Sequence, residues 1–435
     1  MNKFADVLGL NARSADYLVL NKKAARKRAD DKLLTKKMLK RVKVPHPKLL
    51  GTLSSISSVR KFNWKKLKDG FAIKPVQGFG GQGILIIKRQ AKEEGYYWTV
   101  DGKRIGFEEL SIHAQDVVEG KYSHNNLPDK VMIEERIKIH PKFKKLAMGG
   151  APDVRVIVFN RVPVMAMLRL PTEESAGKAN LHQGAIGLGI DMATGITTHG
   201  VYKNNSIKYF PDTNKKVNGI AIPHWDKILN MAVTTQIVSK LPYLSVDMLI
   251  DEDQGPVVLE LNDQPGLSIQ IANMAGLRRR LERVEGLEVE EAEKGVKIGK
   301  ALFASKFASR VKFTGEEKSV IGIFERVKVK NSKKKWIEVP AKIDTGARST
   351  SIDSDLAKSL GLLTEDNILW KKKIKNSLGV EERVLIGITF KLKNRIIKGR
   401  AGVTNRKDLR RQLLIGRRDL RDFVVDPGKV VVRKL

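Results

Sequence analysis

The sequence lacks cysteine and is poor in aromatic residues, and each shortage excludes a class of site. Without cysteine the chain has no disulfide, no thiol nucleophile and no zinc site with Cys ligands. Aromatic residues make up 6% of the sequence, and no array of rings suited to stacking successive bases is evident. No apolar stretch reaches the roughly 20 residues of a membrane-spanning helix, and no basic-then-apolar secretion signal opens the sequence. We therefore expect a cytoplasmic protein with no membrane partner.

Acidic residues are also scarce relative to basic ones. The chain has 82 Lys and Arg against 48 Asp and Glu, a formal net charge of +34. This balance predicts attraction to polyanions such as nucleic acid, nucleotides or an acidic protein tail, although a basic proteome would produce the same balance. With 435 residues, 41% of them hydrophobic, the chain is long enough for two or three folded domains.

An acidic stretch interrupts this basic sequence at residues 244–268. It reads as two apolar strands, 245–250 and 256–261, joined by a polar turn. The side chains that break the apolar pattern are Asp247, Glu260 and Asn262. Carboxylate and amide oxygens are ligands that Mg²⁺ takes, with substrate phosphates filling its other positions, so these three residues are candidate metal ligands. A hairpin with solvated acids at its ends is the alternative.

A glycine-rich loop near residue 80 lies between apolar strands at 71–74 and 84–87. The first strand ends at Lys74, and the loop contains Gly78, Gly80, Gly81 and Gly83. Glycine accepts positive φ and lets backbone N–H groups approach a phosphate closely. Because the loop returns into a strand and no Gly-Lys-Ser/Thr follows, it is neither a Walker loop nor a dinucleotide-binding turn. The pattern predicts a hairpin that covers a nucleotide, and an ordinary flexible hairpin is the alternative.

A basic run occupies residues 22–43. Within it Asp30 or Asp31 is suited to cap a helix, and the spacing of Leu34, Met38 and Val42 predicts the buried stripe of that helix. We interpret the rest as a solvated helix face in preference to a nucleic-acid surface.

The middle of the chain alternates strands with polar segments. Residues 91–130 read as a polar excursion with one short hairpin, and strand 131–134 then ends at the acidic pair Glu134 and Glu135. A helix at 223–241 leads into the acidic stretch.

Two paired strands, at 154–159 and 162–170, carry Arg155 and Arg169. Asn180 and His182 follow in a glycine-rich segment. A lone His182 is by default a surface residue, but its position in a polar cluster between strands predicts a contact to substrate or phosphate.

The pattern changes in the last third of the chain. Residues 276–317 read as a helical, charged connection, and short strands from about residue 318 predict a separate small β domain over 318–435. Asp344-Thr345-Gly346-Ala347 follows an apolar strand directly, and Leu414-Ile415-Gly416 comes later.

The first 275 residues resemble the ATP-grasp superfamily, most closely its alpha-L-glutamate-ligase-like and sugar-transfer-associated members. The parts that carry the resemblance occur in a fixed order: Lys32, Lys74, the glycine loop, Glu134, Asp247, Glu260 and Asn262. The resemblance implies an α+β domain over 1–275, in which two α/β lobes clasp ATP.

The resemblance also implies roles for single residues. Lys32 and Lys74 would reach the ATP phosphates, and Gly78, Gly80 and Gly81 would close over them. Glu134, with the backbone of Glu135 and Ile137, would form the hinge that reads adenine. Asp247, Glu260 and Asn262 would hold Mg²⁺ or Mn²⁺, and Arg155, Arg169, Asn180 and His182 would contact the acyl phosphate or the acceptor. The ribose-binding carboxylate of many relatives has no match, because the chain reads Lys138-Ile139-His140-Pro141 after the hinge.

Residues 318–435 resemble retropepsin-like aspartic proteases, most closely the domain that accompanies such glutamate ligases. Asp344 would be the catalytic carboxylate, in an all-β barrel. An aspartic mechanism needs two carboxylates that share a proton, and this domain has one such motif. The domain would therefore act as a homodimer or as a binding module.

Together these features predict an ATP- and Mg²⁺-dependent carboxylate–amine ligase that acts through an acyl phosphate. It would add an amino acid such as glutamate to an acidic peptide or protein, and its C-terminal domain would cleave the same kind of bond. The alternatives are an aspartic protease regulated by a nucleotide-sensing ATP-grasp domain and a basic protein that binds nucleic acid.

Overall fold

The chain forms two compact units, Met1–Glu285 and Gly286–Leu435, and each is described by itself. The structure is a computed structural model that describes residues 6–78, 81–123, 126–144, 146, 150–304, 319–376, 379–406, 411–420 and 423–429. Gly80, a predicted phosphate-loop residue, lies outside these ranges. No helix in the described ranges is both long and apolar enough to cross a membrane.

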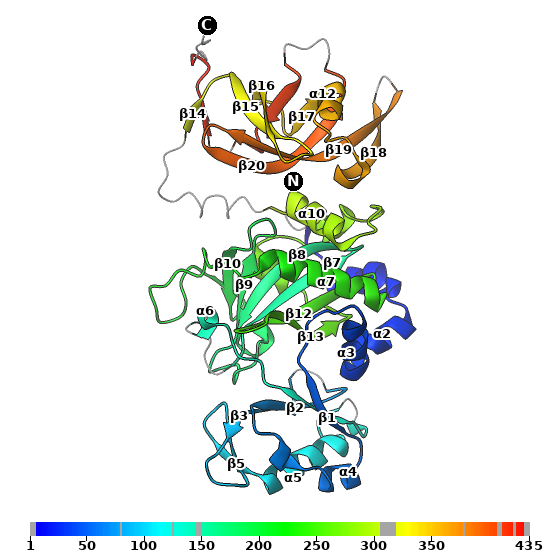
Figure 1. The fold of residues 1–435 in the computed structure, drawn as a ribbon, viewed down its shortest axis with the longest axis vertical. Coiled ribbons are helices and arrows are strands. Elements are labelled where there is room, and N and C mark those ends of the chain that lie inside the picture. The colour runs from blue at the N-terminus through cyan, green and yellow to red at the C-terminus, as the bar shows by residue number, and fades with distance from the viewer. Residues whose placement is uncertain are drawn as a thin grey trace. The chain divides into compact units, whose positions relative to one another are not determined.

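The first unit is built on two sheets, each with helices packed against it (Figure 1). The six-stranded sheet has the order β1-β6-β2-β3-β4-β5. Its strands are β1 Leu49–Leu53, β2 Phe71–Pro75, β3 Leu85–Gln90, β4 Tyr96–Thr99, β5 Arg104–Gly106 and β6 Val131–Glu135. The seven-stranded sheet has the order β11-β10-β9-β8-β7-β12-β13. Its strands are β7 Asp153–Phe159, β8 Val162–Leu170, β9 Ile186–Ile190, β10 Thr197–Tyr202, β11 Asn205–Ile207, β12 Tyr243–Asp251 and β13 Gly255–Asn262.

The helices of this unit confirm one sequence prediction and add an element that was missed. Helix α7, Trp225–Ser239, confirms the helix predicted at 223–241, and it packs on β7, β8, β12 and β13. Helix α5, Phe107–Val118, lies where only a polar excursion was expected, and it buries Leu110, Ala114 and Val117. The other α-helices are α1 Leu10–Ala12, α2 Lys23–Asp30, α3 Lys32–Arg41, α4 Ile56–Arg60, α6 Pro141–Lys144, α8 Ile269–Asn273 and α9 Arg278–Glu282.

Helix α3 is present as predicted, but its buried face is not the predicted one. Asp31 caps it by accepting hydrogen bonds from the backbone N–H groups of Leu33 and Leu34. Leu34 and Val42 are exposed, and the buried side chains are Thr35, Lys36 and Leu39. The prediction was wrong because it counted only apolar residues, whereas an ion pair to Glu134 allows Lys36 to be buried.

The second unit is a small β-barrel, accompanied among the described residues by two α-helices. Six strands close into a ring in the order β15-β16-β21-β17-β20-β19, because β19 also pairs with β15, and β18 extends the sheet beyond β19. The strands are β14 Ser319–Ile321, β15 Phe324–Lys330, β16 Trp336–Asp344, β17 Thr350–Asp353, β18 Ile368–Asn376, β19 Gly379–Leu392, β20 Arg395–Thr404, β21 Leu413–Gly416 and β22 Phe423–Val425. The helices are α10 Ala292–Leu302 and α12 Ser354–Ser359.

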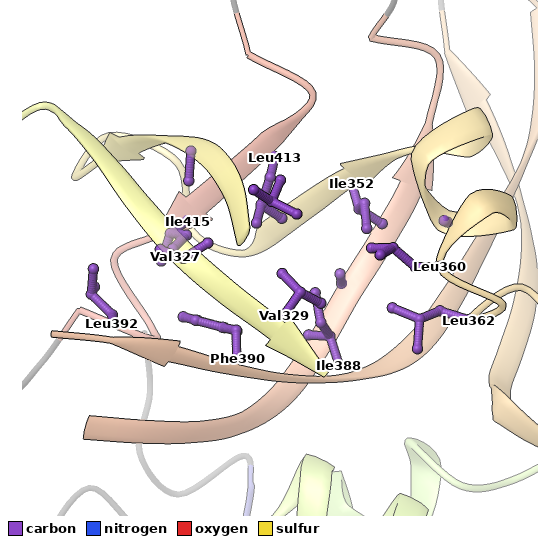
Figure 2. Packing of buried hydrophobic residues seen from close by; sticks show 14 of the residues in the cluster. Val327, Val329, Ile352, Leu360, Leu362, Ile388, Phe390, Leu392, Leu413 and Ile415 are labelled. Carbon is purple, nitrogen blue, oxygen red and sulfur yellow. The ribbon is translucent and has the colours of Figure 1, made fainter. Parts of the chain in front are cut away.

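The barrel interior is filled mainly by aliphatic side chains, together with the rings of Phe390 and Phe423 (Figure 2). Val327 and Val329 of β15, Ile388 and Phe390 of β19 and Ile415 of β21 point into it, each at most 2% exposed. This alternation along each strand buries one face and leaves the other to solvent.

Phe390 provides a test of this core. Replacing it with alanine should lower the free energy of unfolding of the second unit by about 3–5 kcal/mol, because it removes a buried ring and leaves a cavity. Denaturant unfolding followed by circular dichroism measures the loss. Val424→Ala, at a position that is 47% exposed on β22, should change the value by less than about 0.5 kcal/mol. Equal effects of the two substitutions would contradict the packing.

Candidate functional site

The β12–β13 hairpin places the three predicted metal ligands at one edge of the seven-stranded sheet. Asp247 on β12 lies directly opposite Glu260 on β13, and Asn262 is the last residue of β13. On the other side of β12, Asp247 lies opposite Arg155 of β7. Directly opposed residues of antiparallel strands share a face, so the register brings Glu260, Asp247 and Arg155 onto the same surface of the sheet.

Asp247 is held by two arginines inside the protein. Arg155 donates from Nε to Oδ1 at 2.8 Å and from Nη2 to Oδ2 at 2.6 Å, and Arg169 of β8 donates from Nη2 to Oδ2 at 2.7 Å. Arg169 also makes a bidentate pair with Asp153, with both N···O distances 2.6 Å. The result is a buried chain of alternating charges, Arg155–Asp247–Arg169–Asp153, in which every side chain is at most 10% exposed.

The pKa values of the two acids in this row of charges, Asp247 and Asp153, are shifted in opposite directions. Burial opposes ionisation of Asp247, but the two guanidinium groups outweigh it and lower its pKa to about 2. Burial raises the pKa of Asp153 to about 6, and the nearby charge of Asp247 adds to this rise while Arg169 opposes it. Asp247 is therefore the acid that stays ionised, and Arg169 is the cation shared between them.

The oxygen donors of the hairpin are of the type that Mg²⁺ binds, although not all of them are equally accessible. Asp247 already accepts three N–H bonds, and a carboxylate has about four acceptor positions. The Asn262 Oδ1 accepts the backbone N–H of Gln264 at 2.8 Å. Glu260 is half-buried, and its carboxylate makes no hydrogen bond or ion pair to any described residue. Glu260 is thus the most available ligand. The described residues contain no group of three or more His, Asp or Glu arranged to bind a metal, so a site here depends on the Asn262 amide and on phosphate oxygens.

Three lysines surround a second buried acid, Glu134, and one of them, Lys32, also lies near Glu260. Lys36 Nζ lies 2.7 Å from Glu134 Oε2, and Lys74 pairs with Oε1 of the same carboxylate. Burial opposes ionisation of Glu134, but Lys74 and Lys36 outweigh it, so its pKa is lowered. Burial lowers the pKa of Lys32, and the nearby Glu260 carboxylate opposes that shift. Lys32, Lys36, Lys74, Glu134 and Glu260 thus bring together the six-stranded sheet, helix α3 and the β12–β13 hairpin.

Lys36 is a residue of this cluster that the sequence analysis did not single out. Its ammonium donates to the Pro47 carbonyl at 2.6 Å as well as pairing with Glu134. Burial lowers its pKa, and Glu134 opposes that shift. The available signal was its spacing: Lys36 lies one helical turn after Lys32, on the same face of α3. Lys36 was missed because residues 22–43 were interpreted as a solvated helix face.

The predicted hinge residues lie together but their side chains have other partners. The Glu134 side chain points to the lysines. Glu135 makes two hydrogen bonds to Lys48: its Oε1 accepts the Lys48 backbone N–H at 2.8 Å, and the Glu135 N–H donates to the Lys48 carbonyl at 2.9 Å. Ile137 is buried against Leu249 and Val257. The Glu135 N–H is therefore engaged within the protein.

The glycine loop lies close to both the lysines and the segment that carries Asn180. Lys32 Nζ donates to the Gly78 carbonyl at 2.9 Å and to the Val76 carbonyl at 3.2 Å. Gly81 has φ +74°, and a Cβ added there would lie 3.7 Å from the Lys178 side chain. Gly81 therefore lies beside Lys178 with a backbone conformation that favours glycine.

Asn180 and His182 have a local structural role in this segment. The Asn180 Oδ1 accepts the His182 backbone N–H at 3.0 Å and caps a short 3₁₀ turn, Leu181–Gln183. The His182 side chain is exposed. The structure thus brings Lys32, Lys74, Glu134 and Glu260 together, links Asp247 with Arg155 and Arg169, and places His182 on the surface.

Asp344 lies in the second unit, at the end of β16. Its Oδ1 accepts the N–H groups of Gly346 and Ala347, both at 2.9 Å, which closes a tight turn. β16 runs parallel to β21, with Asp344 opposite Gly416. The Arg417 N–H also donates to the Ala347 carbonyl at 2.9 Å. Residues 414–416 therefore lie directly beside the strand that leads into the Asp344 turn.

Lys36→Met tests whether the buried pair with Glu134 holds this part of the site together. The substitution leaves Glu134 buried with one cation fewer, and breaking such pairs costs about 3–5 kcal/mol. Denaturant unfolding of the full chain should show that loss in the transition of the first unit. Lys37→Met, at the exposed neighbouring position of α3, should change it by less than about 0.5 kcal/mol. Matching effects would show that Lys36 is not a buried ion-pair partner.

Comparison with known proteins places most of the first unit in a family. The model of the "Sugar-transfer associated ATP-grasp" family matches residues 12–286, nearly two thirds of the chain. No curated protein matches the sequence.

Solved structures give distant similarities. ATP-grasp ligase PsnB complexed with minimal precursor is 14% identical with a TM-score of 0.34, and the match covers 61% of this chain and 62% of that chain. D-alanine–D-alanine ligase from Bacillus anthracis complexed with ATP is 15% identical with a TM-score of 0.34, over 67% of this chain and 70% of that chain. Protein Lpg0085 of unknown function from Legionella pneumophila subsp. pneumophila str. Philadelphia 1 is 19% identical with a TM-score of 0.19, over 26% of this chain and 96% of that chain. All these scores are low, and the assignment depends on the family model: the chain belongs to the sugar-transfer associated ATP-grasp family.

Proposed function

We propose that the protein is an ATP- and Mg²⁺-dependent carboxylate–amine ligase of the cytoplasm. The observation that carries the proposal is the convergence of Lys32, Lys74 and Glu260 beside the Arg155–Asp247–Arg169 chain, within the segment that the family model matches. The Glu260 carboxylate has no bond to any described residue. A cluster of cations next to an available carboxylate suits a phosphate chain that arrives with its metal ion.

The residues fall into three groups by what they would hold. Lys32, Lys74 and the glycine loop would bind the phosphates, and the backbone near Ile137 would face adenine. Glu260, Asn262 and the remaining acceptor position of Asp247 would hold the metal, which when bound neutralises charge on the phosphate oxygens. Glu134 and Lys36 orient Lys74, so its ammonium is placed before the nucleotide arrives.

The chemistry follows from charge placement without a covalent protein nucleophile. A carboxylate oxygen of the substrate attacks the γ-phosphorus, and ADP leaves with the bonding electrons. The amine nitrogen then attacks the acyl carbon, phosphate leaves, and the nitrogen loses a proton to give the amide. Arg155 and Arg169 would stabilise the transferring phosphoryl group, and Asn180 and His182 would contact the acceptor.

We propose an amino acid such as glutamate as one partner and an acidic peptide or protein as the other, as in the alpha-L-glutamate-ligase-like group. For the second unit we propose a retropepsin-like barrel that cleaves the same kind of bond. The Asp344 turn braced by Gly416 supports this proposal. Because the barrel has one Asp-Thr-Gly motif, hydrolysis would require a homodimer in which each copy supplies one carboxylate.

The test is phosphate release from Mg·ATP by the full chain, offered each amino acid in turn with acidic peptides, with product masses read by spectrometry. The wild type should give a mass increase of one amino-acid residue. Lys74→Met and Glu260→Gln should each reduce phosphate release at least about 10²-fold, because each removes charge stabilisation of the transferring phosphoryl group.

Two further variants complete this test. Lys37→Met, at an exposed position outside the cluster, should retain activity, and so should Asp344→Asn in the other unit. Full activity in Glu260→Gln would refute the ligase assignment. Loss of all activity in Asp344→Asn alone would support an aspartic protease with a nucleotide-sensing first unit.

A further inference from the structure

The outer surface of the barrel carries a concentrated set of lysines. We define the lysine face as Lys328 and Lys330 of β15, Lys391 of β19, Lys398 of β20, and Lys333, Lys334 and Lys335 of the β15–β16 turn. On β15 and β19 these lysines alternate with Val327, Val329, Phe390 and Leu392, which fill the core (Figure 2). Because successive side chains of a strand point to opposite sides, the strand lysines must face outward.

The register of the strands brings like charges face to face. Lys328 lies directly opposite Lys391 across β15 and β19, and Lys391 in turn lies opposite the exposed Ile396 of β20. Like charges at directly opposed positions destabilise a sheet. On its other side Lys328 faces Glu338, but that carboxylate is bonded to Arg326 at 2.8 Å. Among the residues whose side chains the structure describes, which leaves out those of 372–383, no acidic residue pairs with the lysine face.

This unbalanced charge is not required by the fold. A barrel needs only polar side chains on its outer surface, and neutral residues at Lys328 and Lys391 would avoid the repulsion. Charge that costs stability and has no partner inside the chain points to an anion that binds from outside.

The side-chain chemistry favours an acidic polypeptide over nucleic acid. Nucleic-acid surfaces commonly combine Arg forks with several stacked aromatic rings. The cations of the lysine face are Lys point charges, and the neighbouring Arg326 of β15 is bonded to Glu338. One aromatic ring, Trp336, is exposed here at 38%, and the Lys330 ammonium lies 5.8 Å from its centre. Lys328 and Lys330 are two residues apart on one strand, about 6.5–7 Å. Alternate carboxylates of an extended acidic peptide have the same spacing.

We propose that the lysine face is a docking surface for an acidic polypeptide segment, the acceptor of the ligase reaction. The inference rests on the proposed function for the identity of that segment, but the binding itself requires no catalysis. Because the barrel and the ATP-grasp unit are one chain, an acceptor bound to the barrel remains at a raised effective concentration for modification.

Lys391→Glu is the variant that separates this role from a structural one. It replaces a like-charge pair by an opposite-charge pair with Lys328, so the melting temperature of the second unit should stay equal or rise. The same change should weaken binding of a fluorescein-labelled oligoglutamate peptide to the full chain about tenfold at low salt, measured by fluorescence anisotropy. Wild-type binding should weaken as salt is added.

The matched control is Lys61→Glu, an exposed lysine at the end of α4 in the first unit. It changes the net charge of the chain by the same amount and should alter oligoglutamate affinity less than about twofold. Equal weakening by both variants would overturn the proposal, because binding would then follow total charge. A single-stranded oligonucleotide of equal length that binds more tightly than oligoglutamate, and loses affinity in Lys391→Glu, would overturn it in favour of nucleic acid.

The binding test gives its answer whether or not the protein proves to be a ligase. Oligoglutamate binding is measured without ATP, whereas ligase activity is measured by phosphate release with a saturating short acceptor, which Lys391→Glu should leave unchanged. Binding without any ligase activity would refute the proposed function alone. Ligase activity with oligoglutamate affinity insensitive to Lys391 would refute the docking surface alone.

Discussion

Burial of ionised side chains is the constraint from which the arrangement of the first unit follows. A buried charge is costly unless an opposite charge and hydrogen bonds satisfy it, so each buried acid must be surrounded by bases. Asp247 is matched by Arg155 and Arg169, and Glu134 by Lys36 and Lys74. The first cluster joins β7, β8 and β12, and the second joins β2, β6 and helix α3.

The same constraint explains which groups stay available. With Asp247 and Glu134 engaged, the carboxylate of Glu260 lies between the two clusters without a bond of its own in the described ranges, close to Lys32 and Arg169. A site whose cations are already held by buried acids needs little rearrangement when a phosphate chain binds. Under the proposed function, these charges would be in place before an anionic ligand arrives with its cation.

Much of this arrangement could be predicted from sequence because it follows local rules. The β12–β13 hairpin, strand β8 and helix α7 came from apolar periodicity, and the facing of Asp247 and Glu260 follows from the hairpin register. What could not be predicted were contacts between distant segments. The bonds from Arg155 and Arg169 to Asp247, and the burial of Lys36, depend on how β7, β8 and α3 meet their neighbours. Helix α5 was missed because its polar residues masked the buried Leu110, Ala114 and Val117.

The central claim is that a substrate carboxylate attacks the γ-phosphorus of ATP in this site. It is tested most directly with a carboxylate substrate labelled with oxygen-18 in both carboxyl oxygens, followed by mass spectrometry of the phosphate released during turnover. Attack by the carboxylate transfers one labelled oxygen to phosphorus, so the phosphate should carry one oxygen-18 atom per molecule. Release of phosphate without the label, at an undiminished rate, would show that water attacks ATP and would contradict the ligase mechanism.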